Sequence, residues 1–188
     1  MKFDGAEVTG CDVGRSVVEF SKEAYPNFNI LQTPLMPPLP FADNYFRLIY
    51  SFSVFSHLEE NIEHAWLQEL HRVGKSNCLY LWTVQGVWMI EATLQQTEQH
   101  EIHKNGFGFK KVHGRHNSDL DFPVYYESSY HTNRYIRESW SNYFEVLEII
   151  KGDDPHRYLH GELKFASNGG IVPDFRPMGQ DLVVARRR

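Results

Sequence analysis

The sequence predicts an α/β domain with a mainly parallel sheet, helices on both of its faces and an antiparallel last strand. A continuous apolar run begins at Phe46, as in a strand buried on both faces, and ends in small and polar residues between Ser53 and His57. Apolar side chains then recur at helical spacing over residues 62–73, and a second apolar run extends from Leu79 to Val84. A strand, a helix and a strand in this order form a βαβ unit, whose crossover is almost always right-handed.

Length and composition are those of one ordinary globular domain over residues 1–188. The formal net charge of −5 provides no broad surface for a nucleic acid or an anionic membrane. Cys11 and Cys78 fall inside expected strands, which indicates reduced core residues and not a disulfide. No apolar run reaches the roughly 18 residues that span a bilayer, so the cytoplasm is the expected compartment.

Three shorter elements are expected before the βαβ unit. Residues 6–12 read as a strand that ends in the carboxylate of Asp12, residues 16–25 as a helix stopped by Pro26, and residues 28–32 as a further strand. A carboxylate between a strand and a helix either accepts hydrogen bonds from ribose hydroxyls or caps the helix. From the residues alone the cap is the favoured interpretation.

After the βαβ unit, residues 86–131 form an insertion that breaks the alternation of strands and helices, and a long loop follows later in the chain. The elements expected in this half are a helix over 88–103, strands over 106–112 and 124–130, a helix over 133–140, a strand over 144–150, the long loop over 152–179 and a last strand over 180–185. The strand–loop–strand connection at the end makes the last strand antiparallel to its neighbours.

Two patches of the sequence resemble the class I S-adenosylmethionine-dependent methyltransferases. The first consists of PPLPFADNYFRLIYSFSVFSHL and AWLQELHRVGKSNCLYLWTVQG, where the family has Leu-Pro-Phe-x-Asp, a strand end similar to Ser-Val-Phe-x-His-Leu, and Arg-Val before a turn. The second consists of YHTNRYIRESWSNYFEVLEII and the ending GQDLVVARRR. The resemblance implies a Rossmann-like fold, S-adenosylmethionine as the cofactor, and methyl transfer to a small-molecule acceptor.

The resemblance also implies site residues. Asp12 would hold the ribose of the cofactor, and the insertion would cover the mouth of the site and select the substrate. The cofactor-binding residues implied are Gly10, Asp12, Thr33, Leu35, Ser53, Val54 and Phe55, and the substrate-side residues are Tyr125, Tyr126, Tyr130 and His131. The aromatic residues among the latter are equally well explained as strand packing. His57, the candidate catalytic residue, would take the acceptor's proton or only shape the pocket.

Several positions depart from the family pattern. Thr33-Pro34 replaces an Asp-Ala pair whose Asp contacts adenine, and Ser76-Asn77-Cys78 replaces a Pro-Gly-Gly turn. No Asp-x-Gly-x-Gly loop stands before Asp12, as in an N-terminally incomplete domain. The alternative expectation is therefore a fragment or degenerate domain that binds the cofactor weakly or not at all. Unpaired central strands would then favour self-association.

Other chemistries have less support. The pairs His100-x-x-His103 and His113-x-x-His116 match no strong zinc signature and have no cysteines nearby, so no metal site is expected. No Gly-x-Ser-x-Gly elbow predicts a nucleophilic serine. A nicotinamide dehydrogenase would share the acidic strand end at Asp12 but not the Gln-Asp-Leu-Val-Val ending.

Overall fold

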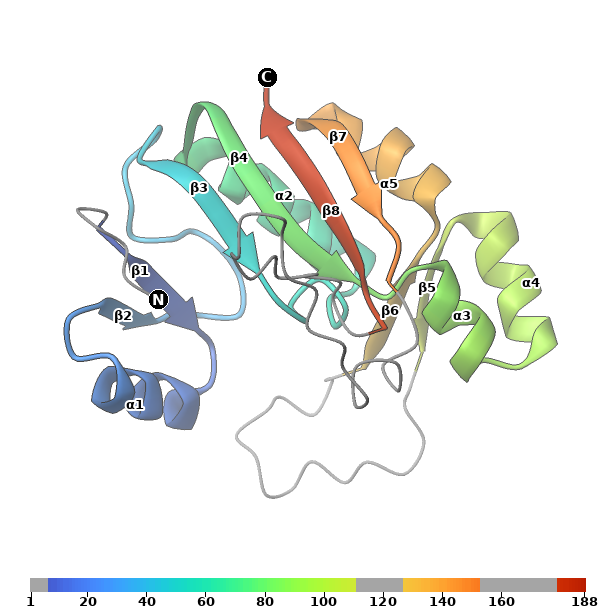
Figure 1. Ribbon diagram of the computed structural model, residues 1–188, viewed down its shortest axis with the longest axis horizontal. Helices are drawn as coiled ribbons and strands as arrows, with labels where there is room; N and C mark the ends of the chain where they lie inside the picture. Colours follow the sequence, from blue (N-terminus) through green and yellow to red (C-terminus); the bar gives the residue numbers. More distant parts are fainter. Residues whose placement is uncertain (1–6, 111–126, 153–178) are drawn as a thin grey trace, which may run out of the picture. The chain divides into compact units, whose positions relative to one another are not determined.

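The computed structural model describes residues 7–110, 127–152 and 179–188, which form two compact units (Figure 1). The described part of unit 1 is residues 7–40, and that of unit 2 is residues 41–110, 127–152 and 179–188. A single domain over the whole chain stays a prediction. Across these ranges, no helix combines the length and the apolar character that a membrane span requires.

Unit 1 is a small strand–helix–strand structure. Strand β1 (Thr9–Asp12) pairs in parallel with β2 (Asn29–Gln32), and helix α1 (Arg15–Ala24) connects them. Val18 is the buried residue of α1. These three elements confirm the order predicted from the sequence. The expected strand residue 6 lies outside the described residues.

Unit 2 contains a four-stranded sheet in the order β3–β4–β8–β7 (Figure 1). Strand β3 (Phe46–Ser51) runs parallel to β4 (Gly74–Val84). Strand β8 (Asp181–Arg187) runs antiparallel both to β4 and to β7 (Phe144–Ile150). The sheet is therefore mixed, and the expectation of an antiparallel last strand is confirmed.

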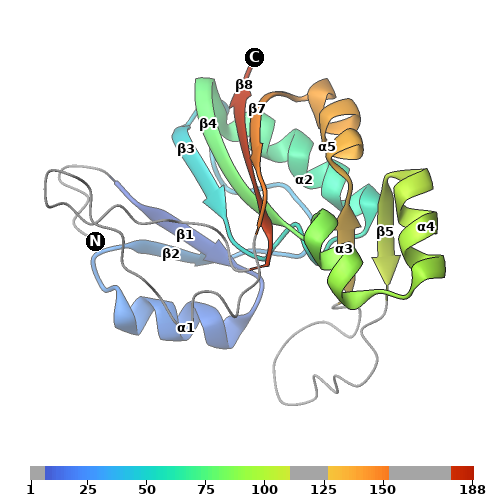
Figure 2. The same cartoon turned by 45° about the vertical axis from the view of Figure 1, so that its right-hand side comes forward.

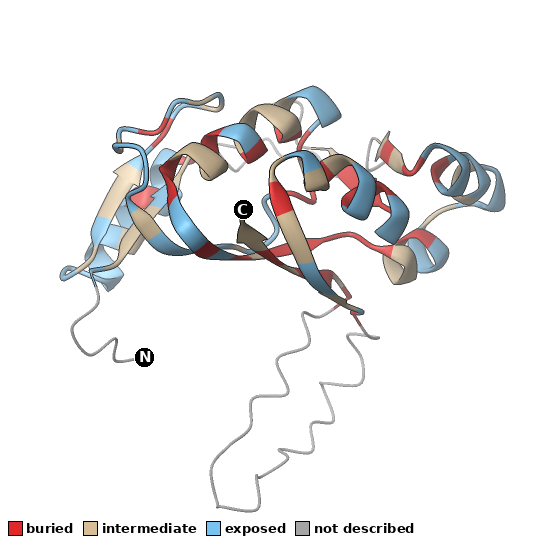
Figure 3. Cartoon of the chain, turned by 90° about the horizontal axis from the view of Figure 1, so that it is seen from above, coloured by how far each residue is buried: buried red, intermediate tan, exposed pale blue. Residues whose placement is uncertain are grey.

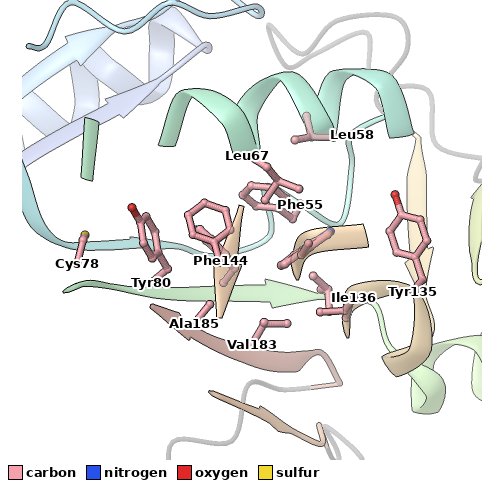
Figure 4. Packing of buried hydrophobic residues seen from close by; sticks show 13 residues of the cluster. Phe55, Leu58, Leu67, Cys78, Tyr80, Tyr135, Ile136, Phe144, Val183 and Ala185 are labelled. Atoms are coloured by element: carbon pink, nitrogen blue, oxygen red, sulfur yellow. The ribbon is translucent and has the colours of Figure 1, made fainter. Parts of the chain in front are cut away.

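Helices α2 (Glu60–Val73) and α5 (Asn133–Ser139) pack against one and the same face of this sheet (Figure 3). The core between these helices and the sheet is rich in aromatic residues (Figure 4). The ring of Phe144 lies 4.5 Å from that of Tyr80 and 5.0 Å from that of Trp82, centroid to centroid. The buried cluster consists of Phe55, Leu58, Leu67, Cys78, Tyr80, Trp82, Val84, Tyr135, Ile136, Trp140, Phe144, Val183 and Ala185.

The described residues of the insertion fold as two helices and a strand pair (Figure 2). Helices α3 (Val87–Thr93) and α4 (Gln96–Asn105) precede β5 (Phe107–Lys110), which pairs antiparallel with β6 (Ser128–His131). A short 3-10 helix, η1 (Trp140–Asn142), follows α5.

The expectation of a single helix over residues 88–103 is wrong. Leu94 and Gln95 are extended, with ψ angles of 156° at both residues, and separate α3 from α4. The backbone N–H of Gln95 donates to the Glu98 carboxylate at 3.2 Å, which closes a capping box and starts a new helix.

Two further expectations about the central strands need correction. Strand β3 is not buried on both faces, because α2 and α5 share the opposite face and leave Leu48 at 47% and Tyr50 at 50% exposure. The expected turn at Ser76-Asn77-Cys78 lies inside β4, as a bulge with Asn77 at φ 62°. A helix layer on the second face of the sheet stays a prediction, since α1 belongs to unit 1.

Candidate functional site

The carboxyl end of β3 is held in an uncommon conformation. Ser53 has φ 54°, a value that few residues other than glycine adopt. Its backbone N–H donates to Oγ1 of Thr83 on β4 at 2.8 Å, and Thr83 itself is buried. The polar end of β3 is thus fixed to the neighbouring strand.

Gln180 brings a third chain segment to the same place. Its Nε2 donates to Oγ of Ser53 at 3.1 Å, or the Ser53 hydroxyl donates to Oε1 at 3.3 Å. Gln180 directly precedes β8, and because β8 is antiparallel, its first residues lie at the carboxyl edge of β3 and β4. Polar groups from Ser53, Thr83 and Gln180 therefore converge at one edge of the sheet.

Exposed apolar side chains adjoin this polar group. Phe52 and Val54 flank Ser53 in the chain and are 47% and 45% exposed. The Phe52 ring also lies 5.8 Å from that of Tyr50. Apolar surface next to a few convergent polar groups is the usual composition of a small-molecule site.

The loop after β3 is tied to the insertion. Nδ1 of His57 donates to the carbonyl of Glu127 at 2.7 Å, so the lone pair of the neutral imidazole is on Nε2. The Ser56 carbonyl accepts from the backbone N–H of Ser129 at 2.8 Å and from Nε2 of Gln85 at 3.1 Å. These bonds fix the position of His57 relative to β4 and β6.

A buried acid–imidazole pair lies below this loop. Oε2 of Glu63 and Nε2 of His131 are 2.6 Å apart, and both side chains have no exposed surface. The other oxygen of Glu63 accepts from Nε1 of Trp140 at 2.8 Å and from the Tyr135 hydroxyl at 3.3 Å. Burial, followed by the charge of Glu63, raises the pKa of Tyr135 and keeps that hydroxyl protonated. Glu63 thus joins α2, β6 and α5.

A second buried carboxylate anchors the start of β8. Asp181 is 1% exposed and accepts from the backbone N–H of Gly152 at 2.8 Å and from that of Val87. Burial raises the pKa of Asp181 above its ordinary value, and these two N–H groups oppose the shift. A Cβ at Gly86 would collide with the Asp181 carboxylate, so the backbone before α3 needs glycine there.

Unit 1 holds the remaining residues implied for the cofactor. Oδ1 of Asp12 accepts from the backbone N–H of Gly14 at 2.7 Å, and the backbone carbonyl of Asp12 accepts from Thr33 N–H at 2.9 Å. Asp12 and Thr33 are therefore adjacent. Gly10 has a packing role, because a Cβ there would lie 2.9 Å from Cδ1 of Ile30 on β2.

The comparisons with known proteins agree with this architecture. A family model described as a methyltransferase domain matches residues 1–81. An S-adenosylmethionine-dependent methyltransferase of Methanosarcina mazei is similar in structure, with 11% identity, 98% of this chain and 83% of the other covered, and a TM-score of 0.62. The chain has the fold of S-adenosylmethionine-dependent methyltransferases. The fold that the resemblance implied is thereby confirmed.

Two other solved methyltransferases show the same fold. One from Mesorhizobium loti is 13% identical over 96% of this chain and 80% of its own, with a TM-score of 0.58. The 1,6-didemethyltoxoflavin-N1-methyltransferase of Burkholderia thailandensis is 9% identical over 97% of this chain and 62% of its own, also with a TM-score of 0.58. That structure has 1,6-didemethyltoxoflavin and S-adenosylhomocysteine bound. None of the curated proteins matches the chain.

The structure brings only some of the implied methyltransferase residues to an accessible place. Ser53 and Val54 are exposed at the strand end, whereas the Phe55 side chain is 1% exposed in the core and leaves only its backbone for a cofactor. On the substrate side, His131 is fully buried, and Tyr130 is 5% exposed with its hydroxyl 3.3 Å from that of Thr93. Tyr125 and Tyr126 lie outside the described residues, and Leu35 is half-buried in unit 1. Asp12 and Ser53 belong to different units, so their expected position around one crevice stays a prediction.

Four functional or supporting residues of this methyltransferase fold were missed from the sequence: Glu63, Thr83, Gln180 and Asp181. Glu63 stands four residues before the buried Leu67 on α2, which places a carboxylate on the core face and was a usable signal. Gln180 stands directly before β8, and Asp181 is the first residue of this strand, ahead of the apolar run over residues 182–185. Nothing in the local sequence links Gln180 or Thr83 to Ser53, since these contacts join distant segments.

Proposed function

We propose that the chain transfers a methyl group from S-adenosylmethionine to a small-molecule acceptor. The convergence of Ser53, Thr83 and Gln180 at the carboxyl edge of the sheet carries this proposal. In open α/β sheets, ligands bind beyond the carboxyl ends of the strands. The B. thailandensis neighbour, with a small molecule and S-adenosylhomocysteine bound, supports the same class of donor and acceptor.

The residues present are compatible with this cofactor. A carboxylate offers about four acceptor positions, and Asp12 uses one of them on Gly14 N–H. The remaining positions suit ribose hydroxyls, and charge-assisted bonds of this type are the stronger ones. The helix cap favoured from the sequence is wrong, because the N-cap of α1 is Gly14 and no side chain caps this helix. Asp12 orders the chain before α1 through its bond to Gly14, and its remaining acceptor positions support the ribose interpretation.

The chemistry requires alignment more than acid or base groups. When bound, the cofactor supplies an electrophilic methyl on a sulfonium sulfur, and the sulfur keeps the electron pair of the broken carbon–sulfur bond. The strand-end residues Ser53 and Val54 would orient the reactants, and proximity alone accounts for much of the barrier reduction in such a displacement. His57, fixed through Glu127, would take the proton that the acceptor loses or shape the acceptor pocket.

A second candidate is a methyltransferase-like domain without cofactor binding. One observation favours it: in the described ranges, β1 is paired only with β2 and β3 is an edge of the other sheet. None of these described residues then forms a glycine-rich strand end that could contact the methionine portion of the cofactor. Under this candidate, Ser53 and Gln180 would be surface residues without a ligand.

Isothermal titration of the 188-residue chain with S-adenosylmethionine and with S-adenosylhomocysteine separates the two candidates. The proposed function requires measurable binding of both, and Asp12→Ala should weaken each by about tenfold or more, because a hydrogen bond to a charged group contributes roughly 1.5–3 kcal/mol. Glu23→Gln removes an exposed charge from α1 of the same unit and should change neither constant. If neither compound binds even at a large excess over the protein, the proposal is contradicted and the second candidate is supported.

A further inference from the structure

The backbone around Gln180 is held by close contacts of the residues on both sides of it. The following residue, Asp181, is anchored by backbone N–H groups on two separate segments, at the start of α3 and after β7. Gly152 packs directly on the backbone of Gln180, where any Cβ would collide with the Gln180 carbonyl. Gly179 has φ 72° and lies against Trp88 and Met89, so the preceding residue is also fixed. The backbone of Gln180 is therefore preorganised.

The side chain of Gln180 extends from this backbone to the polar end of β3. Its amide and the Ser53 hydroxyl are 3.1–3.3 Å apart, in the partly exposed region next to Phe52 and Val54. Any ligand that reaches the Ser53 hydroxyl would thus also meet the Gln180 amide. An amide offers both a donor and an acceptor, but it carries no charge.

We propose that Gln180 is a specificity-determining residue, which contacts the ligand bound at Ser53 and whose lack of charge limits the preference for the charged methyl donor over its uncharged product. This inference rests on the proposed function. S-Adenosylmethionine carries a positive sulfonium and S-adenosylhomocysteine a neutral thioether, so a charge change at position 180 acts on one ligand and not on the other. The native amide forms no ion pair with the sulfonium, so it does not favour the donor over the product.

Gln180→Glu and Gln180→Ala test this assignment by titration with the two compounds. In Gln180→Glu the carboxylate still accepts from the Ser53 hydroxyl but adds a negative charge. We expect the ratio of the dissociation constants to shift about threefold to tenfold toward S-adenosylmethionine. In Gln180→Ala both constants should rise about threefold, with an unchanged ratio. A merely structural residue would alter both ligands equally in both variants.

Gln96→Glu is the matched control, since it adds the same charge at an exposed position on α4. Thermal unfolding of each variant, followed by circular dichroism, identifies variants that fail to fold. If native protein binds both compounds and Gln180→Glu leaves their ratio within the range of Gln96→Glu, the inference is overturned while the proposed function stands. If native protein binds neither compound, the proposed function fails and this inference fails with it.

Discussion

Unit 1 and the centre of unit 2 use the same strand–helix–strand connection but bury very different amounts of apolar side chain. Among the described residues of unit 1, Val18 and Leu39 are the buried hydrophobic residues, whereas thirteen form one cluster in unit 2. In α1, Phe20 is 70% exposed and Val17 is 38% exposed. In unit 2, Tyr80, Trp82 and Phe144 are completely buried.

This difference indicates that the two units differ in stability although they share the same strand–helix–strand connection. Burial of one Val side chain contributes about 1.5–3 kcal/mol, while ordering each residue costs about 1–2 kcal/mol of conformational entropy. The described contacts of unit 1 therefore predict low local stability, whereas unit 2 has a large cooperative core. Asp12, the proposed ribose contact, lies in the weaker unit.

The largest expected effect comes from the core of unit 2. Phe144→Ala should lower the free energy of unfolding by about 4 kcal/mol, because it removes a fully buried ring and leaves a cavity. Val18→Ala in unit 1 should cost less than half as much, and the exposed Val17→Ala about 0.5 kcal/mol or less. Urea unfolding measures the totals, and amide hydrogen exchange resolves them by unit. Equal acceleration of exchange in β1 and β3 by Phe144→Ala would show that the two units unfold as one.

An intermediate effect is expected at the buried pair of unit 2. Glu63→Gln should cost about 3 kcal/mol, since it removes the charge that faces His131 and disturbs the bonds from Trp140 and Tyr135. Glu91→Gln, at an exposed position of α3, is the matched control and should be nearly neutral. Unfolding in urea at constant pH gives both values. A Glu63→Gln protein as stable as Glu91→Gln would mean that the pair does not hold α2 to β6 and α5.

The smallest effect concerns pH. Burial, followed by the charge of Arg187, lowers the pKa of His71, whose Nε2 accepts from Nε of Arg187 at 3.4 Å. Below an ordinary pKa of 6.5 the unfolded chain therefore binds more protons than the folded one, and stability is lost as the pH falls through this value. Unfolding free energies at pH 8 and pH 5 should differ less in His71→Gln than in native protein. The exposed His100→Gln should retain the native difference.

Much of the fold could be predicted because its signals are local. The apolar run at Phe46, the helical spacing over 62–73 and the proline after α1 each determine one element. The break between α3 and α4 was not predicted, because a polar helix continues smoothly in composition across Leu94 and Gln95. The exposure of Leu48 and Tyr50 was not predicted either, since an apolar strand gives no information on which of its faces the helices cover.

The candidate site could be predicted only in part, for the same reason. Ser53 and His57 follow the central strand directly, and their position is a local property of the chain. Gln180 reaches Ser53 across 127 residues, and Glu63 reaches His131 across 68, so no spacing in the sequence reveals these contacts. His131 was expected on the substrate side because the resemblance places the insertion over the mouth of the site, but its partner Glu63 holds it in the interior.

The position of β8 has a consequence for the synthesis of the protein. This strand is the last element of the described chain, yet it occupies the middle of the sheet, between β4 and β7. While the nascent chain is still on the ribosome, β4 and β7 emerge first and have an open position between them, where Val183 and Ala185 will later be buried. The core of unit 2 therefore closes only after residue 187 has been translated, and until then its apolar strands are accessible to chaperones.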